Sequence, residues 1–169
     1  MEHKVFLFGD AAQARTLARY RSLMRSTVAP LLLRLVLAVA FVGHGAQKLF
    51  GWFGGLGLAG TAGYFDSVGL SPGRPLALLS GLAELGGGIL LGLGLLTPLA
   101  ALVLAGNMAV AIATVNVHHG FFSTDGQNGF ELPLTFAAVA VTIGLLGPGP
   151  ISLDHLLARV LRRRGGRHG

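Results

Sequence analysis

The side chains of this sequence that are able to do chemistry are ionisable groups placed in or beside apolar stretches. His44, Lys48 and Glu84 belong to two such stretches, and His118 and Glu131 lie near the ends of two others. An ionisable group within a bilayer is costly, so its presence there favours a functional site. An imidazole and a carboxyl group can relay a proton or bind a quinone headgroup. These five residues form the candidate polar site.

Other chemistries are excluded or disfavoured by the same inventory. The sequence has no cysteine, which removes disulfides, iron–sulfur clusters, thiolate zinc sites and thiol nucleophiles. The group His118, His119 and Glu131 lacks zinc-ligand spacing, and the unequal depths of His44 and His118 disfavour a shared haem. No Walker, Rossmann or nucleophile-elbow pattern occurs. We expect no metal site and no cysteine-ligated cofactor, and a quinone is the cofactor class left open.

The composition shows which elements must position these residues. Hydrophobic residues make up 52% of the 169 residues and charged residues only 12%, whereas a soluble domain has about 25% charged residues. A span of about 20 apolar residues crosses a hydrocarbon core of about 30 Å, and residues 30–50, 75–96, 98–117 and 130–146 qualify. The sequence therefore predicts an all-α integral membrane protein with a four-transmembrane-helix bundle. We expect a membrane domain over residues 29–150, with basic segments over 1–28 and 151–169.

Positive charge is concentrated at the two ends of the chain rather than between the spans. Lys4 and four arginines precede the first span, and five arginines follow the last. The positive-inside rule therefore places both termini in the cytoplasm. The basic N-terminal segment is expected to lie on the anionic leaflet as an amphipathic helix, and residues 153–164, with Ser152 as N-cap, show the same pattern. This distribution indicates lipid rather than nucleic acid as the partner.

Helical spacing indicates which faces point inward. Glu84 shares a face with Ser80, Gly88 and Gly92, and small residues of this kind let helices pack closely. At about 1.5 Å per residue, His44 and Glu84 lie about 10 and 13 Å below the outer ends of their spans. The polar site should therefore open toward the extracytoplasmic side. Residues 51–75, the first outer loop, are expected to include a short interfacial or re-entrant helix.

Structural explanations compete with the functional one. Glu84 can pair with Lys48 as a link between helices, and Asn107 is expected to form an interhelical hydrogen bond. His118 and Glu131 are close enough to the interface to be solvated loop ends. Arg34 lies one turn inside the cytoplasmic end of the first span. Its expected partner is Asp154, just beyond the last span, in a structural ion pair.

Three segments together resemble the DoxX family of small bacterial membrane proteins. They are HGAQKLFGWFGG from residue 44, AELGGGILLGLGLLTPLAALVL from residue 83, and GPGPISLD from residue 147. The resemblance covers about residues 30–154 and implies a four-helix bundle in the bacterial inner membrane. It also carries the family's motif positions onto five residues of this chain, which are Arg34, His44, Lys48, Glu84 and Asp154.

The resemblance also implies a functional context. DoxX and DoxD relatives are associated with membrane redox systems, including a thiosulfate:quinone oxidoreductase subunit and a mycobacterial complex with superoxide dismutase and a sulfurtransferase. Without cysteine this chain cannot carry a persulfide, so partner subunits or direct binding of the oxyanion would have to provide any sulfur chemistry.

Three functions fit these observations. The first is a non-autonomous subunit or anchor of a membrane redox complex that contacts quinone through the polar site and has redox-enzyme subunits as partners. The second is a bundle that binds or conducts a small solute. The third is a structural scaffold, in which faces around Gly88 and Gly92 pack against copies of the chain or other membrane proteins.

Overall fold

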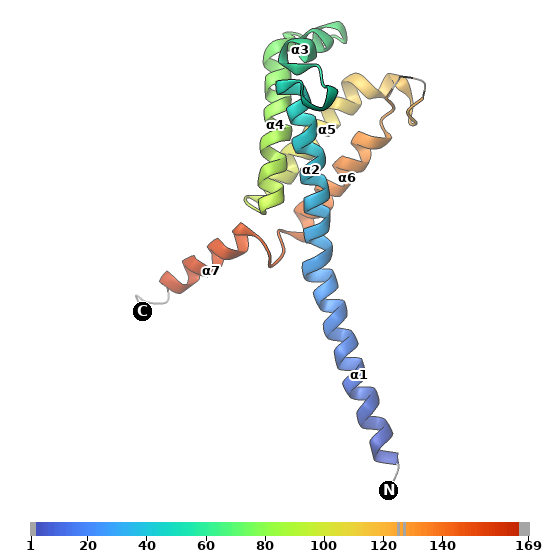
Figure 1. The fold of residues 1–169 in the computed structure, drawn as a ribbon, viewed down its shortest axis with the longest axis vertical. Helices are drawn as coiled ribbons and strands as arrows, with labels where there is room; N and C mark the ends of the chain where they lie inside the picture. The colour runs from blue at the N-terminus through green and yellow to red at the C-terminus, as the bar shows by residue number, and fades with distance from the viewer. Residues whose placement is uncertain (1–2, 125, 127, 166–169) are drawn as a thin grey trace.

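The computed structural model describes residues 3–124, 126 and 128–165, and every regular element in that part of the chain is a helix (Figure 1). The helices are α1 (His3–Leu23), α2 (Ala29–Phe50), α3 (Gly57–Ser67), α4 (Gly73–Leu93), α5 (Thr97–Ala111), α6 (Glu131–Leu146) and α7 (Leu153–Gly165). The all-α expectation is confirmed.

In the part of the chain that the structure describes, three helices are long and apolar enough to cross a membrane. They are Gln13–Phe50, Gly73–Leu93 and Thr97–Val115. The fourth expected span corresponds to α6, whose 16 residues extend about 24 Å at about 1.5 Å per residue, less than a hydrocarbon core of about 30 Å. Pro98 lies in the first turn of α5, where a missing N–H has no helical partner to lose.

The N-terminal helix continues the axis of α2. A π-helical turn, Met24–Val28, joins α1 to α2 without a bend, and α1 extends well beyond the other helices (Figure 1). This differs from the expected helix lying on the leaflet, because the chain stays helical through the π-helical turn and through Pro30, which follows it. α2 ends at Gly51, whose left-handed φ of 72° suits glycine.

Small residues bring α2 and α4 together. A Cβ placed on Gly45 would lie 2.5 Å from the backbone nitrogen of Leu85, and one on Gly88 would lie 3.1 Å from the carbonyl oxygen of Ala38. A Cβ on Gly92 would meet the Ala38 Cβ at 3.1 Å. Backbone approach at this distance requires glycine or a similarly small residue.

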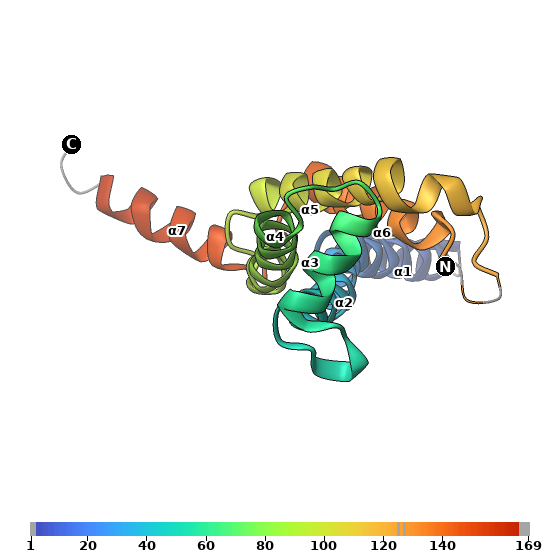
Figure 2. The same cartoon turned by 90° about the horizontal axis from the view of Figure 1, so that it is seen from above.

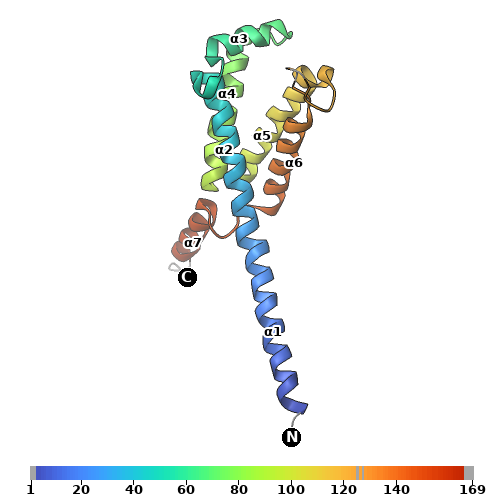
Figure 3. The same ribbon diagram turned by 45° about the vertical axis from the view of Figure 1, so that its right-hand side comes forward.

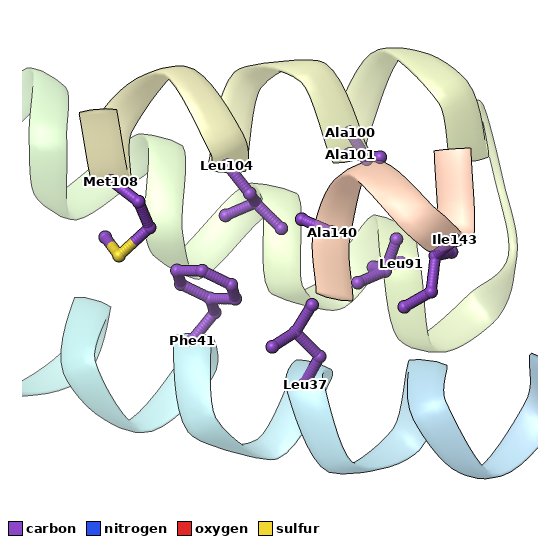
Figure 4. Close-up of a cluster of buried hydrophobic side chains, with 9 residues drawn as sticks. All are labelled: Leu37, Phe41, Leu91, Ala100, Ala101, Leu104, Met108, Ala140 and Ile143. Atoms are coloured by element: carbon purple, nitrogen blue, oxygen red, sulfur yellow. The ribbon is translucent and has the colours of Figure 1, made fainter. Parts of the chain in front are cut away.

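The apolar core joins α2, α4, α5 and α6 near the α4–α5 turn (Figure 4). Its buried members are Leu37, Phe41, Leu91, Ala100, Ala101, Leu104, Met108, Ala140 and Ile143. The pair α5 and α6 diverges from α2 and α4 toward the opposite end of the molecule, where α3 lies (Figure 3). The helices are therefore most tightly joined at one end, and the divergence leaves room for a cavity at the other.

Candidate functional site

The candidate site is centred on Glu84, which lies on α4 and is 1% exposed. Lys48 of α2 donates from Nζ to one carboxylate oxygen at 2.5 Å. Asn107 of α5 donates from Nδ2 to the other oxygen at 2.9 Å. A buried carboxylate is stable only when its oxygens are paired or hydrogen-bonded. The three helices are thus linked through one acidic side chain, a group called the Glu84 cluster from here on.

The Glu84 cluster forms part of the wall of a cavity of about 950 Å³ between α3, α4 and α5. Apolar residues dominate its lining, including Phe65 of α3. Its other polar side chains are Tyr64, Ser80, Thr114, His119 and Asn128. The cavity therefore offers a large apolar surface with charged and amide groups on one part of its wall.

The short helix expected within residues 51–75 is present as α3, and it contributes directly to this cavity. Asp66 at the C-terminal part of α3 accepts hydrogen bonds from Ser71 Oγ at 2.7 Å and from the Gly73 N–H at 2.8 Å. The second contact caps the start of α4. These hydrogen bonds lower the pKa of Asp66, the Ser71 hydroxyl contributing most. The carboxylate thereby fixes α3 against α4 at the cavity.

Only Lys48 and Glu84 of the predicted polar site meet in the structure. His44 lies one helical turn from Lys48, but its Nδ1 is 3.0 Å from Gln47 Oε1, and its ring centroid is 6.0 Å from that of Phe136 on α6. It does not line the cavity around Glu84. Similar depth therefore did not bring His44 and Glu84 together, because the two side chains leave their helices in different directions.

Two further predicted residues lie in or beside the loop between α5 and α6. Glu131 accepts hydrogen bonds from the Ser123 N–H at 2.9 Å on both oxygens, so it organises that loop. His118 is exposed on the short helical turn Val117–His119. The neighbouring His119, absent from the predicted polar site, is the histidine that lines the cavity. No group of metal-binding side chains occurs among the described residues.

Asn107 was predicted to bond between helices, and the structure identifies Glu84 as its partner. The signal was an amide in the middle of an apolar stretch. Such an amide indicates a polar contact but does not identify the partner residue. Tyr64 and Phe65 carried no such signal, because aromatic residues in an outer loop equally suit the headgroup region.

Arg34 is buried at the other end of the bundle and is surrounded by backbone carbonyls. Its Nε donates to Leu91 O at 2.9 Å and its Nη2 to Gly92 O at 2.8 Å. Its Nη1 donates to Ile151 O at 2.9 Å and to the carbonyl of Pro148. The guanidinium therefore ties α2 to the end of α4 and to the segment that follows α6.

Asp154, the expected partner of Arg34, lies near it, and the two charges act on each other, but their side chains do not form a salt-bridge contact. The Asp154 carboxylate instead accepts from the N–H groups of Leu96 at 2.8 Å and Thr97 at 3.0 Å, at the start of α5. Burial acts to raise the pKa of Asp154, but these hydrogen bonds and the charge of Arg34 outweigh it and lower the pKa. The Arg34 guanidinium and the Asp154 carboxylate therefore form hydrogen bonds mainly with backbone groups. A prediction based on side-chain types does not detect such partners.

Comparison with known proteins relates this architecture to one family. The model of the DoxX family matches residues 29–119. The chain is 33% identical over 132 residues to inner membrane protein YqjF of Escherichia coli strain K12, covering 77% of this chain and 92% of that protein. It is 32% identical over 124 residues to an uncharacterized protein of Haemophilus influenzae, covering 73% of this chain and 86% of that protein. No solved structure matches the chain.

Proposed function

This chain belongs to the DoxX family, and from that premise we propose that it is a bacterial inner membrane protein that binds a quinone beside the Glu84 cluster. In this proposal the protein is a non-autonomous subunit of a membrane redox complex. The observation that carries it is the cavity of about 950 Å³, whose apolar wall is interrupted by Lys48, Glu84 and Asn107.

The volume of the cavity and the polarity of its lining both suit a quinone. Small-molecule sites commonly measure about 300–1,000 Å³ and combine apolar walls with a few polar groups that fix orientation. A quinone has a flat apolar ring, an apolar tail and carbonyl oxygens that accept hydrogen bonds. Lys48 and Asn107 supply N–H donors for those oxygens, while the apolar residues of α4 and α5 accommodate the ring.

The three residues of the Glu84 cluster have different roles in this proposal. The Lys48 side chain is 25% exposed and that of Glu84 only 2%, so the ammonium group is the more accessible to a ligand. An ammonium group has three N–H donors, so the bond to Glu84 leaves others for a quinone oxygen. Glu84 is a positioning residue, because it holds both Lys48 and Asn107. Oxidation and reduction of the quinone belong to the partner enzyme.

We also propose that both termini are cytoplasmic and that α6 is the fourth crossing. The N-terminal and C-terminal helices lie at the same end of the molecule as the α4–α5 turn (Figure 1). The two terminal segments together carry most of the Lys and Arg residues. The positive-inside rule assigns such segments to the cytoplasm. α6 supports an even number of crossings, because it returns beside α5 toward that end.

Quinone binding can be measured with the purified protein in lipid nanodiscs. We expect a short-chain ubiquinone to raise the unfolding temperature saturably, since a ligand that binds only the folded state stabilises it. Lys48→Met should abolish this increase, whereas Glu131→Gln, which changes a carboxylate outside the cavity, should retain it. A nonsaturable increase, or an equal increase in Lys48→Met, would refute the quinone site.

The complex itself requires a separate measurement. We expect that tagged protein extracted from its native membranes in mild detergent will recover a redox enzyme, identified by mass spectrometry. Recovery of the protein alone would contradict the subunit proposal. If polar solutes rather than quinones then stabilised the purified protein through Lys48, the cavity would instead be a small-solute site.

A further inference from the structure

The C-terminal helix α7 has an apolar stripe that the protein itself leaves uncovered. The stripe consists of Leu153, Leu156, Leu157, Val160 and Leu161, which recur at i, i+3, i+4, i+7 and i+8. Their exposed fractions range from 36% to 66%. Arg159, Arg162 and Arg163 lie outside this stripe on the helical wheel. Over residues 153–163 the helix is therefore apolar on one side and arginine-rich on the other, which suits the boundary between headgroups and acyl chains.

The first turn of α7 is firmly attached to the bundle. The Asp154 N–H donates to Gly94 O at 2.9 Å, and the Asp154 carboxylate caps α5 through Leu96 and Thr97. The Ser152 hydroxyl accepts from the His155 N–H at 3.1 Å, so Ser152 is the N-cap that the sequence predicted. The start of α7 is therefore held at the α4–α5 turn, at the end of two membrane-spanning helices.

The direction of α7 follows from this attachment. α7 leaves the bundle sideways instead of continuing the line of α4, as two perpendicular views show (Figures 1 and 2). Beyond the first turn, residues 156–163 are all exposed. A helix that leaves the end of membrane-spanning helices sideways is placed to reach the bilayer surface beside the bundle.

We propose that α7 is a docking helix for an anionic lipid surface, with its apolar stripe among the acyl chains and Arg159, Arg162 and Arg163 on anionic headgroups. Charge complementarity selects this occupant, since juxtamembrane arginines are attracted to anionic leaflets. The basic residues Arg15, Arg19, Arg21 and Arg25 of the N-terminal helix and its junction lie toward the same end of the molecule. The inference is independent of the cavity and of the ligand proposed for it.

The chain contains no cysteine, so a single introduced cysteine can report the environment of α7. Leu157→Cys places a label on the apolar stripe, and Ala158→Cys places one on the adjacent residue, about 100° away around the helix. Both leave every arginine in place. Full-length protein labelled with the environment-sensitive dye NBD is reconstituted in nanodiscs of phosphatidylcholine, with or without phosphatidylglycerol.

We expect several-fold brighter NBD emission at position 157 than at position 158 in discs that contain phosphatidylglycerol, and loss of that difference in phosphatidylcholine alone. Replacing Arg159, Arg162 and Arg163 by glutamine should also abolish the difference. Arg74→Gln, which removes an exposed charge at the start of α4, should leave it intact. Unchanged helix content by circular dichroism verifies that each variant is folded.

Three results would overturn the proposal. Equal emission at both positions in anionic discs would mean that the stripe does not enter the bilayer, and would point to a protein as its occupant. A difference that persists in phosphatidylcholine would remove the requirement for anionic lipid. A difference that survives the triple glutamine replacement would show that the arginines do not recognise the headgroups.

Discussion

At the scale of single residues, the Glu84 carboxylate provides polar contacts that join α4 to α2 and to α5. The carboxylate of Glu84 has two donors, a charged one from Lys48 and a neutral one from Asn107. Hydrogen bonds to charged groups contribute more than neutral ones, about 1.5–3 kcal/mol. Removing one partner leaves the other buried and underpaired, which costs more than the contact is worth.

A double-mutant cycle should therefore reveal strong coupling between Lys48 and Glu84. We expect Lys48→Met and Glu84→Gln each to lower the free energy of unfolding by about 1–3 kcal/mol, and the double variant to lose less than the sum. The free energy of unfolding of the wild type, the two single variants and the double variant can be measured in mixed detergent micelles. Strict additivity would contradict a direct energetic link, and the pair Ser67→Ala and Thr142→Ala, far apart on exposed surfaces, serves as an additive control.

Arg34 should not tolerate lysine. Its guanidinium donates to four backbone carbonyls, whereas a lysine has three donors on a single nitrogen and lacks the planar geometry. We expect Arg34→Lys to lower the free energy of unfolding by about 1–3 kcal/mol, the cost of a buried group left unsatisfied. The control is Arg25→Lys at an exposed position, where the change should stay within about 0.5 kcal/mol.

At the scale of elements, the separation of α2 and α4 depends on particular glycines rather than on glycine content. Two glycines only two residues apart on α2 make this testable. A Cβ on Gly45 would lie 2.5 Å from a backbone nitrogen of α4, whereas a Cβ on Gly43 would meet nothing within 4 Å. The same substitution therefore has opposite consequences at the two positions.

We expect Gly45→Ala to destabilise the protein by about 1–3 kcal/mol, since the neighbouring contact is backbone and must move. Gly43→Ala should be neutral or stabilising by up to about 1 kcal/mol, because alanine favours the helix. Thermal unfolding in nanodiscs distinguishes the two. Similar effects of both variants would show that the α2–α4 interface is not as close as described.

The cap that Asp154 places on α5 should depend on pH. The folded-state pKa of this carboxyl lies below its ordinary value of 3.8, so its contribution to stability is present above that value and is lost as the pH falls through the folded-state pKa. We expect the stability difference between the wild type and Asp154→Asn to shrink below about pH 4. Urea or detergent unfolding over that range is the measurement, and a difference that grows on acidification would contradict the assignment.

At the scale of the whole molecule, the number of crossings decides which ends face the cytoplasm. Ser67 is the last residue of α3, Thr124 lies between α5 and α6, and both are exposed. We expect cysteines introduced at these two positions to react with a membrane-impermeant maleimide in intact spheroplasts. A cysteine at Arg163 should react only after the membrane is opened. Protection at position 124 or free reaction at position 163 would contradict the proposed crossing by α6.

The sequence predicted the elements of the site better than its contacts. Lys48 and Glu84 were identified because each ionisable group interrupts an apolar stretch, and their pairing was one of two explanations considered. His44 lies outside the Glu84 cluster, because depth along a helix says nothing about rotation relative to a neighbouring helix. Arg34 and Asp154 were brought to the same end as expected, but backbone groups satisfy them, and such partners leave no trace in side-chain types.

The sequence by itself determined that this protein is helical and membrane-embedded, because hydropathy over about 20 residues reflects the thickness of the hydrocarbon core. Its motifs also determined the DoxX family. Only the tertiary structure decided that Asn107 joins Lys48 at Glu84, that α3 closes one side of the cavity, and that α7 leaves the bundle sideways. Those outcomes depend on the rotation and tilt of helices against one another, and these follow from packing between segments distant in sequence.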